Sequence, residues 1–434
     1  MSRQSQATGF DIRRAAAQRL QTVLTGAPFV PFSAREITDS RDRALANKLV
    51  TVSLRRHGQI SQILISVLEK GMPKRAGLFE AALRIGVAQL LFLPDMGEHS
   101  AIHLAVEVIK KDRRAGRFAK LANGALRNVQ RGFSVDDLDP KDLVPAWVLA
   151  RWEKHYGADV ALKMIEALLA PVPLDLTGKP TEDQSVLFEK MGAVKNLGQS
   201  YRLEDREMAV EELPGYAEGR WWVQDLAATL PVHLAKPQAG QEILDICAAP
   251  GGKTAQLAIT GADVTAVDMD GKRLERVKEN LDRLGLKAKL IEADATNLSA
   301  EKQYDLVVLD APCSATGTYR RHPEVLWHRR EKDIKHRAQL QRDMLQNAAQ
   351  LIKSGGFLVF CTCSLEPEEG ELQVKAFLHK NSDFEIVPIV QEDLENWGEP
   401  ILEGGFLRTL PSMKTPQNGA GMDGFFAAKL QRTK

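Results

Sequence analysis

The stretch EILDICAAPGGKTAQLAI, residues 242–259, contains a complete strand, turn and helix pattern. EILDIC is typical of a buried strand, the segment AAPGG predicts a turn, and KTAQLAI predicts a helix. The alternation continues with DVTAVD, GKRLERVKENLDRLG, AKLIEAD and YDLVVLD, then with GGFLVFCTC, DFEIVP and DGFFAAKL. Strands that alternate with helices indicate a parallel, doubly wound sheet. We therefore expect a Rossmann-like α/β domain over residues 236–434.

The turn of this stretch resembles a phosphate-binding loop only at its end. Gly252, Lys253 and Thr254 match the last residues of the rule G-x-x-x-x-G-K-[ST]. The rule requires a glycine at position 247, where this chain has Cys247. A side chain there obstructs the approach of the loop to phosphate, and the dinucleotide pattern G-x-G-x-x-G is missing as well. Another ligand is therefore expected.

Aspartates recur at the carboxyl ends of the expected strands, where an open α/β sheet binds its ligands. Asp268 ends the second strand, Asp294 follows the third and Asp310 ends the fourth. An acid after the second strand suits a ribose diol, and a glycine turn before a helix suits an anionic group. S-adenosylmethionine carries a ribose and a carboxylate, so we expect it as the cofactor. The alternative, a turn that merely joins strand to helix, does not account for these acids.

Two of the four cysteines stand where catalysis is expected. Cys247 and Cys361 are typical of small buried residues in apolar surroundings. Cys313 and Cys363 each precede a serine and a turn at the end of a strand. A thiolate that adds to carbon-6 of a pyrimidine makes carbon-5 nucleophilic toward a methyl sulfonium, provided that positive charge or a helix end favours the thiolate. The spacing alone does not show which cysteine attacks.

Three segments carry a resemblance to a known family: DICAAPGGKT (245–254), LDAPCSATGTYRRHPE (309–324) and TCSLEPEEGE (362–371). They are similar to the motifs of the Sun group of RNA cytosine-C5 methyltransferases. The helical N-terminal part resembles the antitermination factor NusB, as in the bacterial RsmB (Fmu/Sun) family, and the likeness covers nearly the whole chain. It implies methylation of carbon-5 of a cytosine in 16S ribosomal RNA, with S-adenosylmethionine as methyl donor.

The resemblance also implies roles for single residues. Cys363 maps onto the nucleophile, Cys313 onto the thiol that helps to release the product, and Asp310 onto the acid that holds the cytosine edge. Glu369 matches an acid of the motif, although an acidic first turn of a helix is the simpler interpretation. Gln224 and Asp225 match the segment that leads into the catalytic domain. The cofactor contacts that carry over are Cys247, Ala248, Ala249, Pro250, Gly251, Gly252, Lys253, Asp268, Asp294 and Asp310.

Two further domains are expected before residue 236. Apolar residues spaced three and four apart predict an all-α, NusB-like RNA-binding bundle over 1–140. Mixed short segments predict a small α+β linker domain over 141–235. Basic segments at 110–120 and 319–337 predict RNA contacts, although a charge run is more usually a solvated helix face. The residues expected to bind RNA are Lys110, Lys111, Arg113, Arg114, Arg320 and Arg321.

Composition limits the remaining possibilities. The 434 residues are 44% hydrophobic and 26% charged, with a net charge of +1. No run of about 18 apolar residues and no apolar N-terminal core occur, so we expect a cytoplasmic protein without a membrane span. Neither cysteines nor histidines show metal-ligand spacing, so no metal is expected. We expect a monomer. The alternatives are an RNA-binding scaffold with an idle methyltransferase fold, which the pair Cys313 and Cys363 disfavours, and the same chemistry on transfer RNA.

Overall fold

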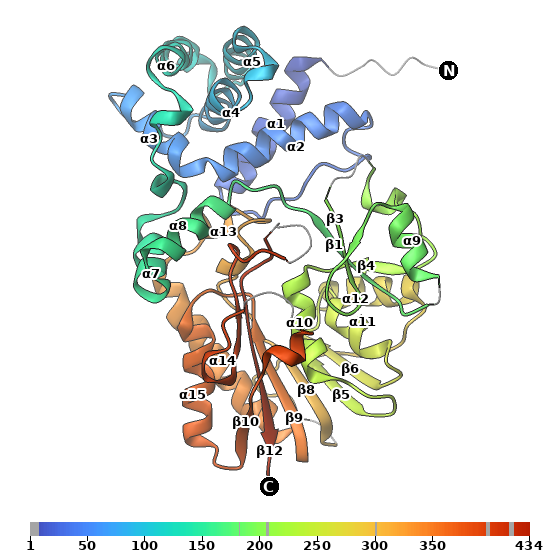
Figure 1. Cartoon of the computed structure of the whole chain (residues 1–434). Coiled ribbons are helices and arrows are strands. Elements are labelled where there is room, and N and C mark those ends of the chain that lie inside the picture. Colours follow the sequence, from blue (N-terminus) through green and yellow to red (C-terminus); the bar gives the residue numbers. More distant parts are fainter. Residues whose placement is uncertain (1–7, 182, 205–207, 300–301, 396–399, 416–420) are drawn as a thin grey trace. The chain divides into compact units, whose positions relative to one another are not determined.

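The computed structural model describes residues 8–181, 183–204, 208–299, 302–395, 400–415 and 421–434 (Figure 1). The chain divides into two compact units, the first made of Met1–Leu169 and His322–His328, the second of Ala170–Arg321 and Arg329–Lys434. The helices at 146–156 and 158–167, which the sequence placed in the linker domain, lie in the first unit. The three-domain division at residues 140 and 235 stays a prediction.

The first unit is helical, as predicted. Its centre is α4 (Phe79–Phe92), which is buried from Phe79 through Leu90 except at its first acidic residue. The helix is apolar around most of its circumference, as expected of a core helix. A side chain at Gly86 would lie 3.0 Å from Ala105, so a glycine is needed for this close packing. The other helices are α1 (Gly9–Leu24), α2 (Ser40–Arg55), α3 (His57–Val67), α5 (Glu98–Lys111), α6 (Ala119–Gly132), α7 (Ala146–Tyr156) and α8 (Ala158–Ala167).

A short segment from far along the chain completes this unit. It contains α13 (Val325–His328). The Trp327 ring lies 4.6 Å from the His57 ring, and Glu324 accepts a hydrogen bond of 2.9 Å from the backbone N–H of Phe29. His328 Nε2 lies 2.8 Å from the backbone oxygen of Val23. Residues 322–328 thus contact residues that lie 270 to 305 positions earlier in the chain.

The second unit begins with a small antiparallel sheet in the order β2-β3-β1-β4. Trp221, Phe188 and Leu176 form the centre of its core, and Phe188 stacks on the Tyr201 ring. This α+β composition agrees with the pattern read from the sequence. The elements are β1 (Leu174–Gly178), α9 (Gln184–Lys190), β2 (Val194–Lys195), β3 (Ser200–Leu203) and β4 (Trp221–Val223).

The large sheet has the order β10-β12-β9-β8-β5-β6-β7, with β11 paired to β12. Strands β5 to β9 pair in parallel, whereas β12 runs antiparallel to both β9 and β10. The Rossmann-like sheet is confirmed, and its antiparallel edge is an addition that the sequence did not predict, because strand direction does not show in the apolar pattern of DGFFAAKL. The strands are β5 (Glu242–Ile246), β6 (Asp263–Asp268), β7 (Lys289–Glu292), β8 (Tyr304–Asp310), β9 (Ile352–Thr362), β10 (Phe384–Val387), β11 (Leu407–Thr409) and β12 (Phe425–Arg432).

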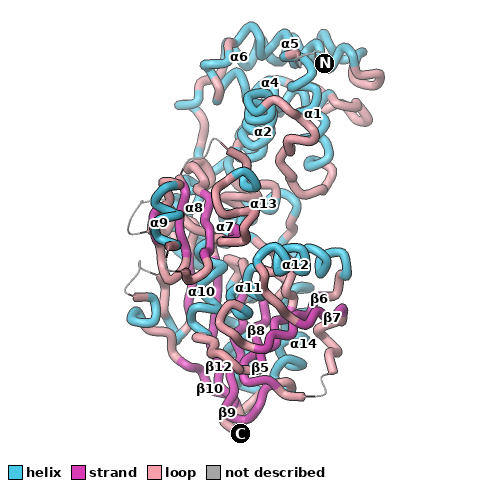
Figure 2. Tube along the Cα trace, turned by 90° about the vertical axis from the view of Figure 1, so that its right-hand side faces the viewer, coloured by secondary structure: helices cyan, strands magenta, loops and turns pink. Residues whose placement is uncertain are grey.

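Helices cover both faces of this sheet (Figures 1 and 2). On one face pack α14 (Glu331–Gln350) and α15 (Glu371–Lys380), through Met344 and Phe377 among others. On the other pack α10 (Leu226–Ala235), α11 (Gly252–Ala258) and α12 (Gly271–Leu284). The two central strands β5 and β8 are therefore buried, which explains their nearly continuous apolar sequences.

The strand order reverses between β5 and β8, because β6 lies on one side of β5 and β8 on the other. Ligands of open α/β sheets bind at such a switch point, beyond the carboxyl ends of the strands. In the next pair, Asp310 of β8 lies opposite Cys361 of β9. The motifs identified in the sequence therefore meet at one edge of the sheet. Among the described helices, none has both the length and the apolar character needed to cross a membrane.

Candidate active site

The turn after β5 brings its backbone close to neighbouring side chains. Gly251 has a φ of +101°, and a Cβ atom there would lie 3.1 Å from Val277. A Cβ at Gly252 would lie 3.2 Å from the Gln224 side chain. Both the left-handed backbone and the lack of space require glycine at 251. The turn is held from behind by Asp268, whose Oδ2 accepts a hydrogen bond of 3.2 Å from the backbone N–H of Ala249.

This turn forms one wall of a cavity of about 590 Å³. The size is within the usual range for sites that bind small molecules. The residues that the sequence predicted and that line the cavity are Cys247, Ala248, Ala249, Pro250, Gly251, Gly252, Lys253, Asp310, Arg321 and Cys363. Sequence reasoning missed other lining residues, including Trp222, Asp245, Asp423 and Phe425. Asp245 lies within EILDIC, which the sequence predicts only as a buried strand, and MDGFF (422–426) offers an apolar strand but no motif.

Two acids expected to hold the cofactor do not line this cavity. The Asp268 carboxylate is enclosed by the backbone N–H groups of Ala249 and Asp270 and by Arg273. Asp294 is exposed after β7, where its Oδ1 accepts hydrogen bonds of 2.8 Å from both the backbone and the hydroxyl of Thr296. Their contacts with a cofactor stay predictions, and the observed role of Asp268 is to support the turn.

A buried ion pair joins the first and second family motifs at the cavity wall. Lys253 Nζ lies 2.8 Å from Asp310 Oδ2 and 5.0 Å from the centre of the Phe425 ring. Burial alone would lower the pKa of Lys253, but the Asp310 carboxylate outweighs it and raises the pKa above its ordinary value. Lys253 is therefore an ammonium group at neutral pH. It is paired with the carboxylate of Asp310, which also lines the cavity.

Asp245 is a buried acid beside this pair. Its Oδ2 accepts a hydrogen bond of 2.6 Å from Thr254, whereas its Oδ1 has no hydrogen-bond partner among the described residues. Burial raises the pKa of Asp245 to about 7. An acceptor without a donor at the wall of a cavity is a place where a ligand donor fits.

The two cysteines singled out in the sequence lie side by side. Their Sγ atoms are 3.4 Å apart. Cys363 lines the cavity, whereas Cys313 is only 8% exposed. The hydrogen bond to Cys363, and then burial, raise the pKa of Cys313 well above its ordinary value. Cys313 is thus a thiol that can donate a hydrogen bond to Cys363, and of the two only Cys363 lines the cavity.

The other two cysteines differ from this pair. Cys361 is fully buried, as predicted, and burial raises its pKa. Its Sγ lies 3.7 Å from Asp310 Oδ1. Cys247 is partly buried in the turn, and burial raises its pKa to about 12. Neither group is placed to act as a thiolate near neutral pH.

Glu369 holds the two cysteine loops together. It accepts hydrogen bonds from the backbone N–H of Ser314 at 2.9 Å and from the Ser364 hydroxyl at 2.6 Å. These serines directly follow the two active-site cysteines. The simpler interpretation, an acid that only favours a helix end, was therefore wrong. The acid is fully buried, which a spacing pattern cannot reveal.

Comparisons with known proteins agree with this geometry. A family model described as 16S rRNA methyltransferase RsmB/F matches residues 232–431, and a NusB family model matches residues 11–131. Ribosomal RNA small subunit methyltransferase B of Serratia proteamaculans is 36% identical over 435 residues, covering 95% of this chain and 94% of its own. The chain belongs to the RsmB/F family. It is an RNA methyltransferase with a NusB-like N-terminal domain.

Solved structures show the same fold. The crystal structure of PH0851 has a TM-score of 0.82 and 23% identity, and the match covers 98% of this chain and 99% of that one. NSun6 from Pyrococcus horikoshii, solved with SFG, has a TM-score of 0.57 and 21% identity, over 67% of this chain and 98% of its own. At these identities the likeness shows the fold alone.

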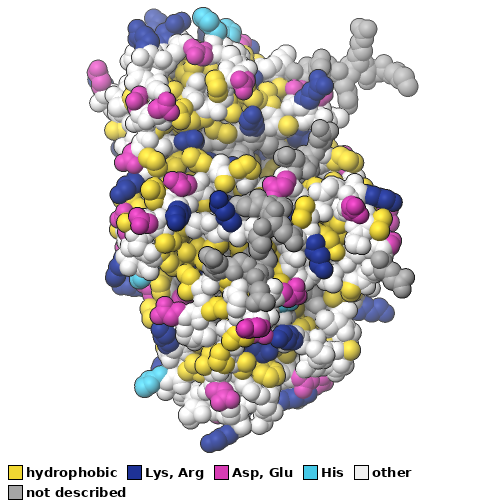
Figure 3. All heavy atoms as spheres, in the orientation of Figure 1, with side chains coloured by type: hydrophobic (Ala, Val, Ile, Leu, Met, Phe, Trp, Pro, Cys, Tyr) yellow, Lys and Arg dark blue, Asp and Glu magenta, His cyan; other side chains and the backbone are white. Residues whose placement is uncertain are grey.

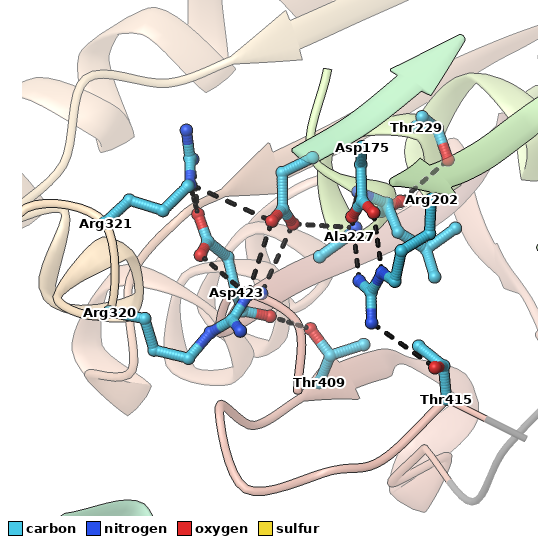
Figure 4. Close-up of polar contacts among 11 residues, drawn as sticks. Asp175, Arg202, Ala227, Thr229, Arg320, Arg321, Thr409, Thr415 and Asp423 are labelled. Atoms are coloured by element: carbon cyan, nitrogen blue, oxygen red, sulfur yellow. Dashed lines mark hydrogen bonds and ion pairs between the residues drawn. The ribbon is translucent and has the colours of Figure 1, made fainter. Parts of the chain in front are cut away.

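The two adjacent arginines of the second family motif, Arg320 and Arg321, have different surroundings (Figure 4). The Arg320 side chain is 1% exposed and its Nη2 lies 3.5 Å from both Asp225 Oδ2 and Asp423 Oδ1. Arg320 is therefore removed from the set expected to meet RNA phosphates, because its charge is buried against two acids. The Arg321 side chain is 36% exposed and lines the cavity.

The NusB-like domain of this RsmB/F member carries a separate basic concavity of about 1130 Å³. Arg113 and Arg114, expected to bind RNA, line it together with Arg75 and Arg117. Arg75 was missed because it lies outside the basic run that follows α5. Lys110 and Lys111 are exposed in the last turn of α5. On the face drawn in Figure 3, described basic and acidic side chains are interspersed.

Within the described ranges, no group of three or more His, Cys, Asp or Glu side chains is placed to hold a metal ion.

Proposed function

We propose that this protein transfers a methyl group from S-adenosylmethionine to carbon-5 of a cytosine in 16S ribosomal RNA, through a covalent bond to Cys363. The observation that carries the proposal is the Cys313–Cys363 pair, 3.4 Å apart at a cavity that the glycine turn and Asp310 also line. Membership of the RsmB/F family supports the RNA class of the substrate.

The residues of the cavity fit S-adenosylmethionine. The turn is too tight for side chains at Gly251 and Gly252, and Asp245 Oδ1 offers an acceptor suited to an ammonium group. Asp268 and Asp294 stay the proposed ribose-side acids. SFG, present in the NSun6 structure, is an analogue of S-adenosylmethionine. When bound, S-adenosylmethionine supplies an electrophilic methyl group.

The chain's own groups then account for the remaining chemistry. The Cys363 thiolate forms a bond to carbon-6 of cytosine, and the electron pair of the 5,6 double bond becomes available at carbon-5 for the methyl group. After methylation, loss of the carbon-5 proton restores the double bond and breaks the sulfur–carbon bond. Cys313 supports this release by donating its hydrogen bond to the departing Cys363 sulfur. Asp310 and Lys253 provide an acceptor and a donor for the polar edge of the base.

The RNA must present an unstacked cytosine, because carbon-6 is inaccessible to a thiolate inside a helix. We assign the phosphate contacts to Arg321 beside the cavity and to Lys110, Lys111, Arg113 and Arg114 on the NusB-like domain. Arg75 and Arg117 join this set, because they line the same concavity as Arg113 and Arg114. A cytoplasmic location and a monomeric protein belong to the same proposal.

The deciding experiment incubates the full chain with S-adenosylmethionine and unmodified 16S ribosomal RNA, with transfer RNA in parallel. Nucleosides from the digested RNA are analysed by mass spectrometry. We expect 5-methylcytidine in the ribosomal RNA alone. Signal only in transfer RNA would overturn the substrate, and a methyl group at another atom would overturn the cysteine mechanism.

A further inference from the structure

Cys363 needs a source of positive charge if it is to react as a thiolate. Among the described residues, the only hydrogen bond of its sulfur is to Cys313, a neutral thiol. Cys363 lies just beyond the end of β9, and the next helix, α15, does not begin until Glu371. Lys253 on the cavity wall is already paired with Asp310. The thiolate therefore requires a cation from another part of the site.

Arg321 lines the same cavity as Cys363. Its Nε donates a hydrogen bond of 2.9 Å to Asp423 Oδ2, and its Nη2 contacts the same oxygen. Asp225 Oδ2 lies 3.8 Å from Arg321 Nε. Figure 4 shows that one nitrogen of this guanidinium points away from the Asp423 carboxylate. Among the described residues, the acids thus fix the guanidinium group and leave one of its edges without a partner.

Backbone hydrogen bonds fix the loop that carries Arg321 against the end of β9. Gly317 N–H donates to the backbone oxygen of Cys363 at 3.0 Å, and Gly424 N–H donates to the oxygen of Gly317 at 2.9 Å. The backbone N–H of Arg321 donates a hydrogen bond of 3.0 Å to the backbone oxygen of Thr318 and so closes a turn. Gly317 leaves no space for a side chain, since a Cβ there would meet the backbone of Gly424 and lie 2.9 Å from the Cys363 oxygen. The arginine and the cysteine are therefore held in one rigid turn.

Arg320 keeps this arrangement close to electrically balanced. With it, two guanidinium groups face the two carboxylates of Asp225 and Asp423. Burial and then the nearby Asp423 raise the pKa of Asp225 to about 6, so Asp225 is mostly ionised at pH 7.5. Without Arg320, two carboxylates would face one arginine, and negative charge near the cavity would oppose a thiolate.

We propose that Arg321 is a positioning residue for the nucleophile, in which a guanidinium fixed by Asp423 and Asp225 stabilises the thiolate form of Cys363. The direction of the electrostatic effects agrees: burial alone would lower the pKa of Arg321, while Asp423, Asp225 and a Cys363 anion each raise it. The inference rests on the proposed function for the identity of the nucleophile.

The test measures the thiolate directly and requires neither RNA nor methyl transfer. The full chain is treated with iodoacetamide at pH 7.0, and the modification rate of Cys363 is followed by mass spectrometry, with fragmentation to separate it from Cys361. We expect Arg321→Gln to slow alkylation of Cys363 roughly fivefold to tenfold, as for the loss of one nearby charge. Arg321→Lys, which retains the charge, restores at least half of the rate.

A second comparison covers the case in which Arg321→Gln unfolds because it leaves Asp423 unpaired. The double variant R321Q/D423N removes the ion pair as a unit, and its alkylation rate is compared with that of D423N. Slower alkylation in the double variant supports the proposal. The proposal would be overturned if Arg321→Gln alkylated as fast as the wild type and R321Q/D423N as fast as D423N, at unchanged unfolding midpoints. Arg321 would then have a structural role only. If the alkylation result holds while no 5-methylcytidine forms, only the proposed function fails.

Discussion

Glu369 accepts a hydrogen bond of 2.9 Å from the backbone N–H of Ser314, the residue after Cys313. The same carboxylate binds the hydroxyl of Ser364, the residue after Cys363. One buried acid therefore sets the distance between two thiols that lie 50 positions apart in the chain. Because two reacting groups must be placed within a fraction of an ångström, this acid should matter for the rate although it touches neither sulfur.

Replacing Glu369 by glutamine puts an amide donor where Ser314 N–H needs an acceptor. We expect Glu369→Gln to lower single-turnover methyl transfer roughly tenfold to a hundredfold and to reduce the free energy of unfolding by about 1–3 kcal/mol. Affinity for S-adenosylmethionine, measured by calorimetry, stays unchanged. Glu385→Gln, which removes an exposed acid of β10, is the matched control. It should change neither the transfer rate, nor the free energy of unfolding, nor the affinity for S-adenosylmethionine. A wild-type rate in E369Q would exclude the bridge as a determinant of cysteine placement.

The asymmetry of the two thiols predicts different defects. Cys363→Ala removes the attacking sulfur and abolishes 5-methylcytidine formation. Cys313→Ala leaves the attack possible but removes the hydrogen bond to the departing sulfur, so a covalent protein–RNA species accumulates. A denaturing gel with labelled RNA detects it as a band of reduced mobility. Accumulation in C363A instead of C313A would reverse the assignment.

Gly251 allows a direct test of the cofactor turn. Gly251→Ala forces a Cβ to within 3.1 Å of Val277 and strains a φ of +101°. We expect the turn to shift and the dissociation constant of S-adenosylmethionine to rise about tenfold. Gly240→Ala is the control, since Gly240 also has a positive φ, of +77°, but open space around it. Both variants lose similar stability from backbone strain, and only G251A changes affinity. If G251A and the wild type bound S-adenosylmethionine with equal affinity, the cofactor would not bind at this turn.

The buried acid Asp245 predicts a pH dependence of stability. Its folded pKa of about 7 lies above the ordinary 3.8, so the folded protein binds this proton more tightly than the unfolded chain. Its contribution to the free energy of unfolding is therefore fully present below pH 3.8 and declines as pH rises to 7, by about 1.4 kcal/mol per pH unit at most.

Asparagine at this position cannot titrate and still accepts the Thr254 hydrogen bond. We measure the free energy of unfolding in urea for both proteins at pH 5.0 and at pH 8.0. We expect the stability of Asp245→Asn relative to the wild type to be greater at pH 8.0 than at pH 5.0. Other carboxylates titrate in both proteins and cancel in this difference. A stability difference that is the same at both pH values would show that Asp245 has an ordinary pKa.

The basic concavity of the NusB-like domain predicts a salt effect. Arg75→Gln combined with Arg117→Gln removes two charges that line it. If each contacts a phosphate, the slope of log K against log salt for RNA binding decreases by about 0.7–0.9 per charge. Arg41→Gln, an exposed arginine of α2 that does not line the concavity, is the control. An unchanged slope in the double variant would remove this surface from the RNA contacts.

The sequence alone determined the order of strands and helices, the helical N-terminal unit and the placement of Cys247, Asp310 and Cys363 at one sheet edge. These features follow from local periodicity and from the rule that parallel strands end at the same edge. Only the tertiary structure decided which neighbours are buried together. Arg320 and Arg321 are adjacent in the sequence, yet one is enclosed by acids and the other lines the cavity.

The contribution of Asp423 was likewise invisible in the sequence, and Glu369 appeared there only as a match to an acid of the family motif, without its partners Ser314 and Ser364. Asp423 reaches the cavity because the last strand inserts antiparallel beside β9, a pairing between residues 64 to 74 positions apart. Glu369 acts through hydrogen bonds to a loop 55 residues earlier. Local spacing records which face of an element is apolar, but contacts between distant segments depend on how all the elements pack. That packing is the reason why the loops and their acids could not be placed from sequence patterns.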